Sequence, residues 1–288
     1  MTITIGVHNS NPSLYYLSRL DFAQQELAAV GESAVFHAYV NGVRTGELLT
    51  QGVIDFGGTG STPPVTAQAA GHDIVYTAVS APRPDHGALL VLDDSPVRTV
   101  ADLKGGTVHL AIGSWQTHLI AKALDDAGLS YASDITPVRG DEHSEKLLRS
   151  GEITAWVAQG AQLVAALRTG GVRVVIRTGD VISDRSVFFT RRDLAEQRPD
   201  VIDALTRALR RADDWARENP REAAEIAAEH QGGTAADWET ALRALPWRIE
   251  PVSDAFLAEQ QRGADIFLRT GFIDRPVTVA HAVARKAA

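Results

Sequence analysis

The chain has 288 residues, of which 44% are hydrophobic and 22% charged, values that are ordinary for a soluble globular protein of about two domains. Its net charge of −8 and the lack of a Lys/Arg-rich run argue against a nucleic-acid-binding protein. Because the chain has no cysteine, disulfides, a thiolate nucleophile, cysteine-ligated metals and a lipoprotein anchor are also excluded.

Predicted strands and helices alternate from the N-terminus onward. Strands are expected at residues 2–7, 34–39, 53–57 and 74–79, and helices at Pro12, Thr45 and Pro63. Asn11 before Pro12, and Thr62 before Pro63, are typical N-cap residues followed by proline at the first helical position. This βαβαβ order predicts a parallel sheet with helices on both faces.

A second α/β unit of similar size is expected in the middle of the chain. Residues 86–91 are predicted to cross into this unit, and residues 186–190 to cross back. From residue 192 onward the pattern is helical. The sequence therefore predicts two α/β lobes with a ligand cleft between them, lobe 1 from residues 1–87 and 189–288, and lobe 2 from residues 88–188.

No stretch reaches the roughly 18 apolar residues of a membrane helix, so no membrane insertion is expected. The first seven residues alternate in polarity and are typical of a strand, not of an export signal. We therefore expect a cytoplasmic protein if Met1 is the native start. If the sequence is a trimmed mature chain, a periplasmic or cell-surface protein is expected instead.

Five segments carry a resemblance to a known superfamily; they are residues 55–71, 94–105, 154–156, 215–220 and 259–273. They resemble the type II periplasmic-binding-protein superfamily, and specifically the substrate-binding proteins of aliphatic sulfonate, taurine and nitrate ABC importers. The resemblance implies a two-lobed α/β fold with two crossings and with the C-terminal helices packed on lobe 1. It also implies a monomer that binds a small anion, without cofactor or nucleic acid, and an ABC permease as partner.

The chain is also similar to the aromatic sulfinate desulfinases, which are enzymes built on the same fold. Phe56-Gly57-Gly58, Gly113-Ser114-Trp115 and Gln197-Arg198-Pro199 carry this second resemblance. Those enzymes depend on a cysteine in the first strand–helix turn, where this chain has Ser10, and Asp55 stands where an arginine is expected. The desulfinase mechanism therefore cannot be transferred to this chain.

Three predicted helix starts are candidates for holding an oxyanion, because helix N-termini offer N–H donors and about half a positive charge. These starts follow Asn11, Thr62 and Ser114. Each candidate side chain also has an ordinary explanation as a helix cap, a solvated loop residue or a surface aromatic. The candidate ligand-binding residues are Asn9, Ser10, Asn11, Thr59, Gly60, Ser61, His86, Ser114, Trp115, His118, Arg139, Trp156, Gln159 and Arg185.

The leading hypothesis is a non-catalytic binding protein for a small organic anion, most simply a sulfonate. The alternative is a cytosolic enzyme on the same fold, a desulfinase-like lyase or hydrolase in which Ser10, His86 and His118 are the catalytic candidates. A ligand-responsive regulatory module is a third reading, although no attached DNA-binding element is visible. The nine histidines are scattered along the chain, so no metal site is expected.

Overall fold

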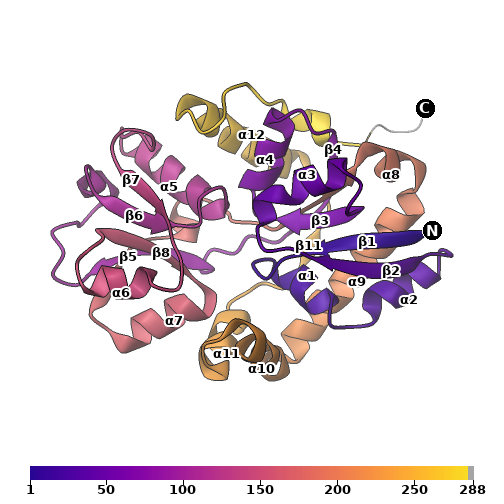
Figure 1. Cartoon of the computed structure of the whole chain (residues 1–288), viewed down its shortest axis with the longest axis horizontal. Coiled ribbons are helices and arrows are strands. Elements are labelled where there is room, and N and C mark those ends of the chain that lie inside the picture. Colours follow the sequence, from indigo (N-terminus) through magenta and orange to yellow (C-terminus); the bar gives the residue numbers. More distant parts are fainter. Residues whose placement is uncertain (285–288) are drawn as a thin grey trace.

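Two separate β-sheets organise the computed structural model, which describes residues 1–284 (Figure 1). The first sheet has the strand order β11 (Ile249–Glu250), β4 (Ile74–Ser80), β10 (Val187–Arg191), β3 (Phe56–Thr59), β1 (Thr2–Val7) and β2 (Ser33–Ala38). The second has the order β7 (Thr136–Arg139), β6 (Thr107–Leu110), β8 (Ala155–Gln159), β5 (Gly87–Leu92) and β9 (Val172–Arg177).

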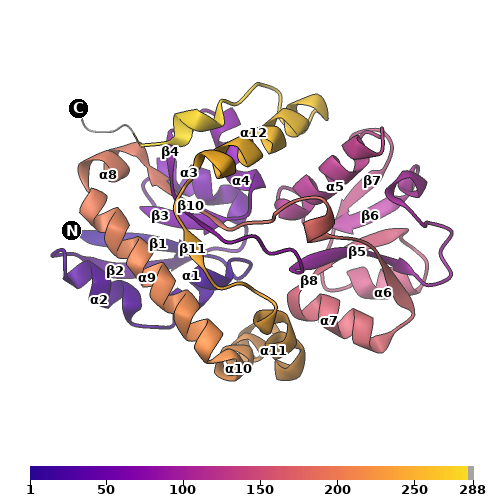
Figure 2. The same cartoon turned by 180° about the vertical axis from the view of Figure 1, so that it is seen from behind.

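Helices cover both faces of the sheets, and they belong to three parts of the chain (Figures 1 and 2). Those of the N-terminal part are α1 (Pro12–Leu17), α2 (Phe22–Ala28), α3 (Thr45–Thr50) and α4 (Thr62–Ala69). The second sheet carries α5 (Trp115–Asp126), α6 (Ser144–Arg149) and α7 (Gly160–Thr169). The C-terminal part adds α8 (Arg192–Gln197), α9 (Pro199–Glu218), α10 (Pro220–Gln231), α11 (Ala235–Arg243) and α12 (Asp254–Arg269).

Alternating side chains of the central strands build two cores on opposite faces of the first sheet. Phe188 of β10 packs with Phe56 and with the apolar faces of α1, α2 and α9. Its neighbour Phe189 points the other way, into the core shared with α3, α4 and α12. Both phenylalanines are fully buried, as expected for a strand covered by helices on both faces.

The sheets are mixed: β1, β2 and β3 pair in parallel as predicted, but β5 and β10, whose residues were predicted as crossings, are inserted antiparallel. β1 pairs in parallel with β2 and β3, and β6 pairs in parallel with β7 and β8. In contrast, β10 is antiparallel to β3 and β4, and β5 is antiparallel to β8 and β9. The parallel rule applies to strands joined through a helix, whereas β5 and β10 enter their sheets directly from the other lobe.

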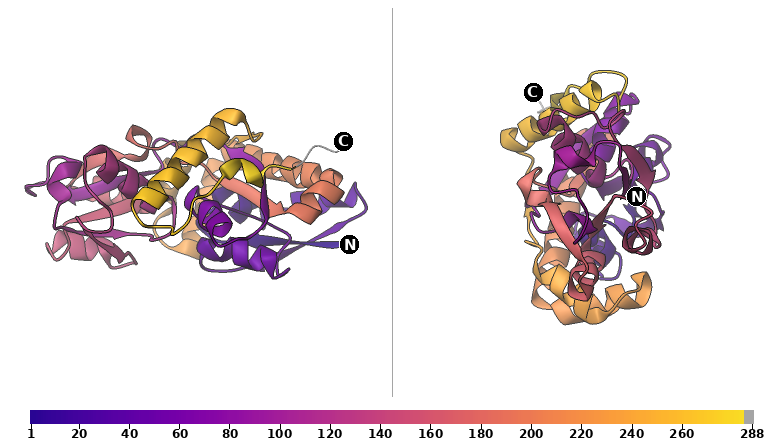
Figure 3. Two further views of the ribbon diagram at one scale, coloured as in Figure 1. Left: turned by 90° about the horizontal axis from the view of Figure 1, so that it is seen from above. Right: turned by 90° about the vertical axis from the view of Figure 1, so that its left-hand side faces the viewer.

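Residues 86–91 and 186–190 were predicted as crossings but lie mainly in strands β5 and β10. The connections between the sheets are the stretches just before these strands, residues 81–86 and 181–186, the second of which follows the short 3-10 helix η3 (Thr178–Asp180). The chain thus enters the second sheet at residue 87 and returns to the first at residue 187. The limits of the two lobes remain a prediction. The two lobes lie side by side, and α12 extends from the first toward α5 of the second (Figures 2 and 3).

Truncating Phe188 to Ala should strongly destabilise the fold. The side chain is 0% exposed and stacks on Phe56 with ring centroids 6.3 Å apart, so its removal leaves a cavity costing about 3–5 kcal/mol. Phe36→Ala is the matched control, because Phe36 is 37% exposed on edge strand β2. Urea unfolding of both variants checks this, and an equal loss of stability in the two would contradict it.

Candidate functional site

A cleft of about 790 Å³ lies between the lobes, at the carboxyl ends of strands from both sheets. The first lobe contributes residues that follow β1 and β3, including Ser10, Thr59 and Gly60. The second contributes residues that follow β6, β7 and β8, including Ser114 and Arg139. This is where ligands bind in open α/β sheets, and the volume is in the range of small-molecule sites.

The start of α1 forms one edge of the cleft through Ser10, which is exposed. The Asn11 side chain accepts a hydrogen bond from the Leu14 N–H at 3.1 Å, which confirms the predicted N-cap. Asn11 is buried and is not among the residues that line the cleft. Asn9 is exposed and lines a neighbouring chamber. Of Asn9, Ser10 and Asn11, therefore, Ser10 alone lines the interlobe cleft, together with the preceding His8.

The start of α4 forms the second edge. The helix begins at Thr62, and its N-cap is Ser61, whose side chain caps no N–H group; the prediction of Thr62 as cap was wrong. Thr62 instead links the two lobes, because its Oγ1 donates a hydrogen bond to the Ser114 carbonyl at 2.7 Å. Pro63 and Pro64 occupy the second and third helical positions and have no N–H for a side chain to cap, and the turn at Thr59 and Gly60 just before them lines the cleft.

The start of α5 forms the third edge, from the other lobe. Ser114 is its N-cap, as predicted, and accepts a hydrogen bond from the Gln116 N–H at 3.1 Å. Trp115 is 5% exposed because it fits between two glycines of the facing segments. A Cβ at Gly60 would lie 3.1 Å from the Trp115 Cβ, and one at Gly87 only 2.4 Å from its ring. Trp115 thus lines the cleft with a limited part of its surface while it joins the lobes.

Ser61 and His118 lie away from the cleft, in a contact between α4, α5 and α12. The Ser61 hydroxyl is 3.0 Å from His118 Nδ1, and the Ser61 carbonyl accepts a hydrogen bond from Gln260 Nε2. The His118 ring packs edge-on against Phe267 of α12. Neither Ser61 nor His118 lines the cleft, so both serve the lobe–lobe contact rather than the site.

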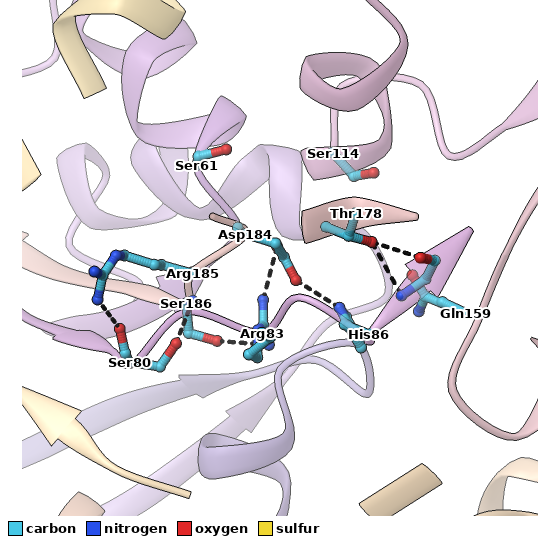
Figure 4. Close-up of polar contacts among 12 residues, drawn as sticks. Ser61, Ser80, Arg83, His86, Ser114, Gln159, Thr178, Asp184, Arg185 and Ser186 are labelled. Carbon is cyan, nitrogen blue, oxygen red and sulfur yellow. Dashed lines mark hydrogen bonds and ion pairs between the residues drawn. The ribbon is translucent and has the colours of Figure 1, made fainter. Parts of the chain in front are cut away.

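A buried ionic cluster ties the two crossings together (Figure 4). Arg83 of the first crossing donates hydrogen bonds to Asp184 at 3.0 Å and to Ser186 at 3.2 Å of the second. His86 Nδ1 lies 2.7 Å from the other Asp184 oxygen. Because a carboxylate only accepts hydrogen bonds, Nδ1 carries the proton and donates it.

The charges in this cluster follow from burial and pairing. Burial, together with the positive charge of Arg83, lowers the pKa of His86, which is therefore neutral at pH 7. Burial alone would raise the pKa of Asp184, but Arg83 and His86 outweigh it and hold the pKa below its usual value. The pair Arg83–Asp184 is thus a charged, buried ion pair with neutral His86 as a further donor.

Arg185 does not reach the cleft. Its Nη1 donates to the Ser80 carbonyl and to Glu250 at 2.7 Å each, and its Nε lies 3.6 Å from Glu259. The Arg185 guanidinium, which was expected to bind an oxyanion, is therefore paired with Glu250 and Glu259 of the protein itself. Of the two arginines at the crossings, Arg83 is the one that lines the cleft, and the sequence argument did not single it out.

The remaining predicted residues lie on the second-lobe side. Arg139, Trp156 and Gln159 all line the cleft. Arg139 is exposed, and its side chain makes no hydrogen bond or ion pair within residues 1–284, whereas Trp156 is 5% exposed. Gln159 Oε1 accepts a hydrogen bond from Gln116 Nε2 at 3.0 Å. Gln116, a side-chain donor two residues after the Ser114 cap, also lines the cleft.

The three catalytic candidates of the enzyme hypothesis are not joined into one unit. His118 contacts Ser61, and His86 contacts Asp184. Ser10 lies on the far edge of the cleft, and within residues 1–284 no hydrogen bond links it to either histidine. In the same part of the chain no three His, Cys, Asp or Glu side chains gather as metal ligands.

Comparison with known proteins assigns the family. The family model described as "NMT1/THI5 like" matches residues 35–223. A putative aliphatic sulfonates-binding protein of Escherichia coli K12 is 34% identical over 81% of this chain and 73% of its own length. The chain belongs to the NMT1/THI5-like family. This membership agrees with the resemblance to sulfonate-binding proteins seen in the sequence.

Solved structures confirm the two-lobed periplasmic-binding-protein-like fold. The periplasmic aliphatic sulphonate binding protein SsuA of Escherichia coli superimposes with a TM-score of 0.88 at 29% identity, over 99% of this chain and 92% of that one. SsuA of Xanthomonas axonopodis pv. citri, bound to MOPS, gives 0.85 at 27% identity, over 99% and 98%. The desulfurization enzyme DszB gives 0.66 at 18% identity, over 99% and 96%, which shows a shared fold alone.

Stability should fall in mild acid partly because of His118. Burial lowers the pKa of His118 to about 4, the Asp184 charge opposing and the Lys122 charge adding to this shift. Since the unfolded imidazole titrates near a pKa of about 6.5, the unfolded state binds the extra proton first, and stability drops as the pH falls from about 6.5 toward about 4. The slope from one such group is at most about 1.4 kcal/mol per pH unit.

His118→Asn removes this proton and should flatten the decline of Tm between neutral and mildly acidic pH, whatever it does to Tm at neutrality. Calorimetric melting over a pH series measures the slope. His143→Asn is the control, because the His143 side chain is 67% exposed and its loss removes no buried contact. An unchanged slope in the His118 variant would show that another group governs the acid response.

Proposed function

We propose that this chain binds a small organic sulfonate in the interlobe cleft, as the substrate-binding protein of an ABC importer. One observation carries the proposal: the starts of α4 and α5, from opposite lobes, meet at one cleft and are joined by the Thr62–Ser114 hydrogen bond. Both helices point the positive ends of their dipoles toward the same space. A sulfonate, with three acceptor oxygens and one negative charge, fits such a space.

The electrostatics of the lining support an anion despite the net charge of −8. Arg139 faces the cleft without a carboxylate partner in the described chain, and Arg83 stands at its base. Asp141 and Glu142, which follow Arg139 closely along the chain, also border the cleft. Charges elsewhere on the surface are screened beyond roughly 8 Å at physiological salt, so the local donors decide.

The relatives support the choice of ligand class and partner. Proteins similar to this chain over most of their length are named as aliphatic sulfonate-binding proteins, and the SsuA structure from Escherichia coli is named as periplasmic. We infer an extracytoplasmic location and delivery of the ligand to an ABC permease. The cytoplasmic location expected from the N-terminal sequence lacks such support. No helix within residues 1–284 has both the length and the apolar run required to cross a bilayer.

The enzyme alternative is not favoured. The named sulfonate-binding relatives are considerably more similar to this chain than DszB is. The place of the desulfinase cysteine is held by Ser10, which has no histidine or carboxylate hydrogen-bonded to it within residues 1–284. Without a base beside it, a serine hydroxyl is a poor nucleophile.

A short sulfonate should stabilise the folded chain. Ethanesulfonate, taurine and MOPS should each be tested by thermal shift and calorimetry, with nitrate and sulfate as other anions. A ligand that binds only the folded state adds about 2.7 kcal/mol at a hundred times its Kd, so a hit shifts Tm clearly. The absence of binding by every sulfonate in the panel would overturn the proposed function.

Ser10→Asp should weaken sulfonate binding at least about tenfold, because a carboxylate would then face the anion across the cleft. Ser10 is exposed, so the fold should tolerate the change. Ser133→Asp adds the same charge at an exposed position that does not line the cleft. Equal affinities of the two variants, measured by titration calorimetry, would place the anion elsewhere.

A further inference from the structure

Two hydrogen bonds in series orient the side-chain amide of Gln159. The Ala111 N–H donates to Gln116 Oε1 at 2.7 Å, and Gln116 Nε2 donates to Gln159 Oε1 at 3.0 Å. Because a backbone N–H can only donate, the Gln116 atom that faces Ala111 is the oxygen, and the atom that faces Gln159 is the amide nitrogen. The backbone therefore sets the direction of both amides, and Gln159 keeps its N–H donors for another partner.

The turn that carries Gln116 holds this residue by its backbone as well as by its side chain. The Ser114 hydroxyl donates to the Ala111 carbonyl at 2.7 Å, and the Gln116 N–H donates to the same hydroxyl oxygen at 3.1 Å. Gln116 is 4% exposed and lies in the first turn of α5. Its amide is thus fixed before any ligand arrives, and so is the amide of Gln159 that it contacts.

Gln159 directs its amide to the cleft instead of using it within its own lobe segment. It is the N-cap residue of α7, yet its side chain caps no N–H group of that helix. Ala111, Gln116 and Gln159 all line the cleft, so the amide ends there. Within residues 1–284 no group accepts a hydrogen bond from Gln159 Nε2. Oriented N–H donors beside the positive end of α5 favour an oxygen that accepts hydrogen bonds and carries negative charge.

We propose that Gln159 is a specificity-determining residue of the cleft and that Gln116 is the residue that positions it. Gln159 Nε2 donates to an oxygen of the bound anion, and the fixed direction of the amide keeps its own oxygen away from that anion. The cleft therefore favours a head whose oxygens all accept, as in a sulfonate, over a head of equal charge that retains an O–H. The inference rests on the proposed function for the ligand class and adds the residues that distinguish these heads.

The test compares ethanesulfonate with ethylphosphonate by titration calorimetry on the full chain at about pH 6. Both are then mainly monoanions of similar shape, but the phosphonate retains an O–H, and the unaltered chain should prefer ethanesulfonate. A hydrogen bond to a charged group contributes about tenfold or more in affinity, so Gln159→Met should weaken ethanesulfonate binding at least about tenfold. Gln159→Glu should weaken it further and reduce the preference, because the phosphonate O–H can donate to the new carboxylate.

Gln162→Met is the matched control, because Gln162 also lines the cleft but its side chain makes no hydrogen bond in the described part of the chain. This variant should alter either affinity by no more than about twofold. If ethanesulfonate binds and Gln159→Met leaves its affinity within about twofold, the role of Gln159 is refuted while the proposed function is retained. If no sulfonate binds the unaltered chain, the proposed function fails, and the selection by Gln159 fails with it.

A double-mutant cycle tests the positioning role of Gln116. Gln116→Glu still accepts from the Ala111 N–H but cannot donate to Gln159, so the Gln159 amide should turn over and present its oxygen to the anion. The added charge acts in every background, whereas this reversal requires Gln159. Gln116→Glu should therefore cost ethanesulfonate at least about fivefold more affinity in the unaltered chain than in the Gln159→Met chain. Equal losses in the two chains would overturn the positioning role.

Discussion

The ion pair between Arg83 and Asp184 is the constraint on which the rest of the molecule depends. It lies at the point where both crossings pass between the lobes, and its side chains are nearly inaccessible to solvent. Asp184 also has a φ of +41°, a left-handed backbone conformation that costs energy in a residue with a Cβ. The fold keeps this strained residue because its carboxylate satisfies Arg83 and His86 together. Loss of one partner would leave the other charged and buried, at a cost of about 3–5 kcal/mol.

From this fixed point the two lobes bring complementary parts to one cleft. The first lobe offers an α4 start that no side chain caps, and the second offers a capped α5 start whose carbonyl at Ser114 holds Thr62. The α5 start fixes the distance between the lobes through this bond, while the α4 start, whose Pro63 and Pro64 have no N–H, contributes its dipole to the cleft. Cation, dipoles and hydroxyls then act on an anion at contact, where screening is weakest.

The sequence predicted well what short-range rules determine. The caps Asn11 and Ser114 followed from residue type and a neighbouring helix pattern, and the family segments indicated the two-lobed fold. The sequence could not predict which of the two arginines at the crossings reaches the cleft. The answer depends on the residues to which Arg83 and Arg185 bind, and these partners are distant along the chain. The direction in which His118 points likewise depends on its contact with α12. The antiparallel pairing of β5 and β10 depends on the fact that each strand enters its sheet from the other lobe.

The wedge formed by Trp115 between Gly60 and Gly87 has an optical consequence. With the lobes together, the indole is 5% exposed and lies against the His86 ring, with centroids 5.1 Å apart. A rotation that separates the lobes would part Trp115 from Gly60, just after β3 of the first sheet, while its ring stays against Gly87 of the second sheet, so one side of the residue would become exposed to water. Trp115, one of the chain's five tryptophans, thus places an intrinsic fluorophore at the contact between the two lobes, where its contribution to the emission should change when the lobes separate.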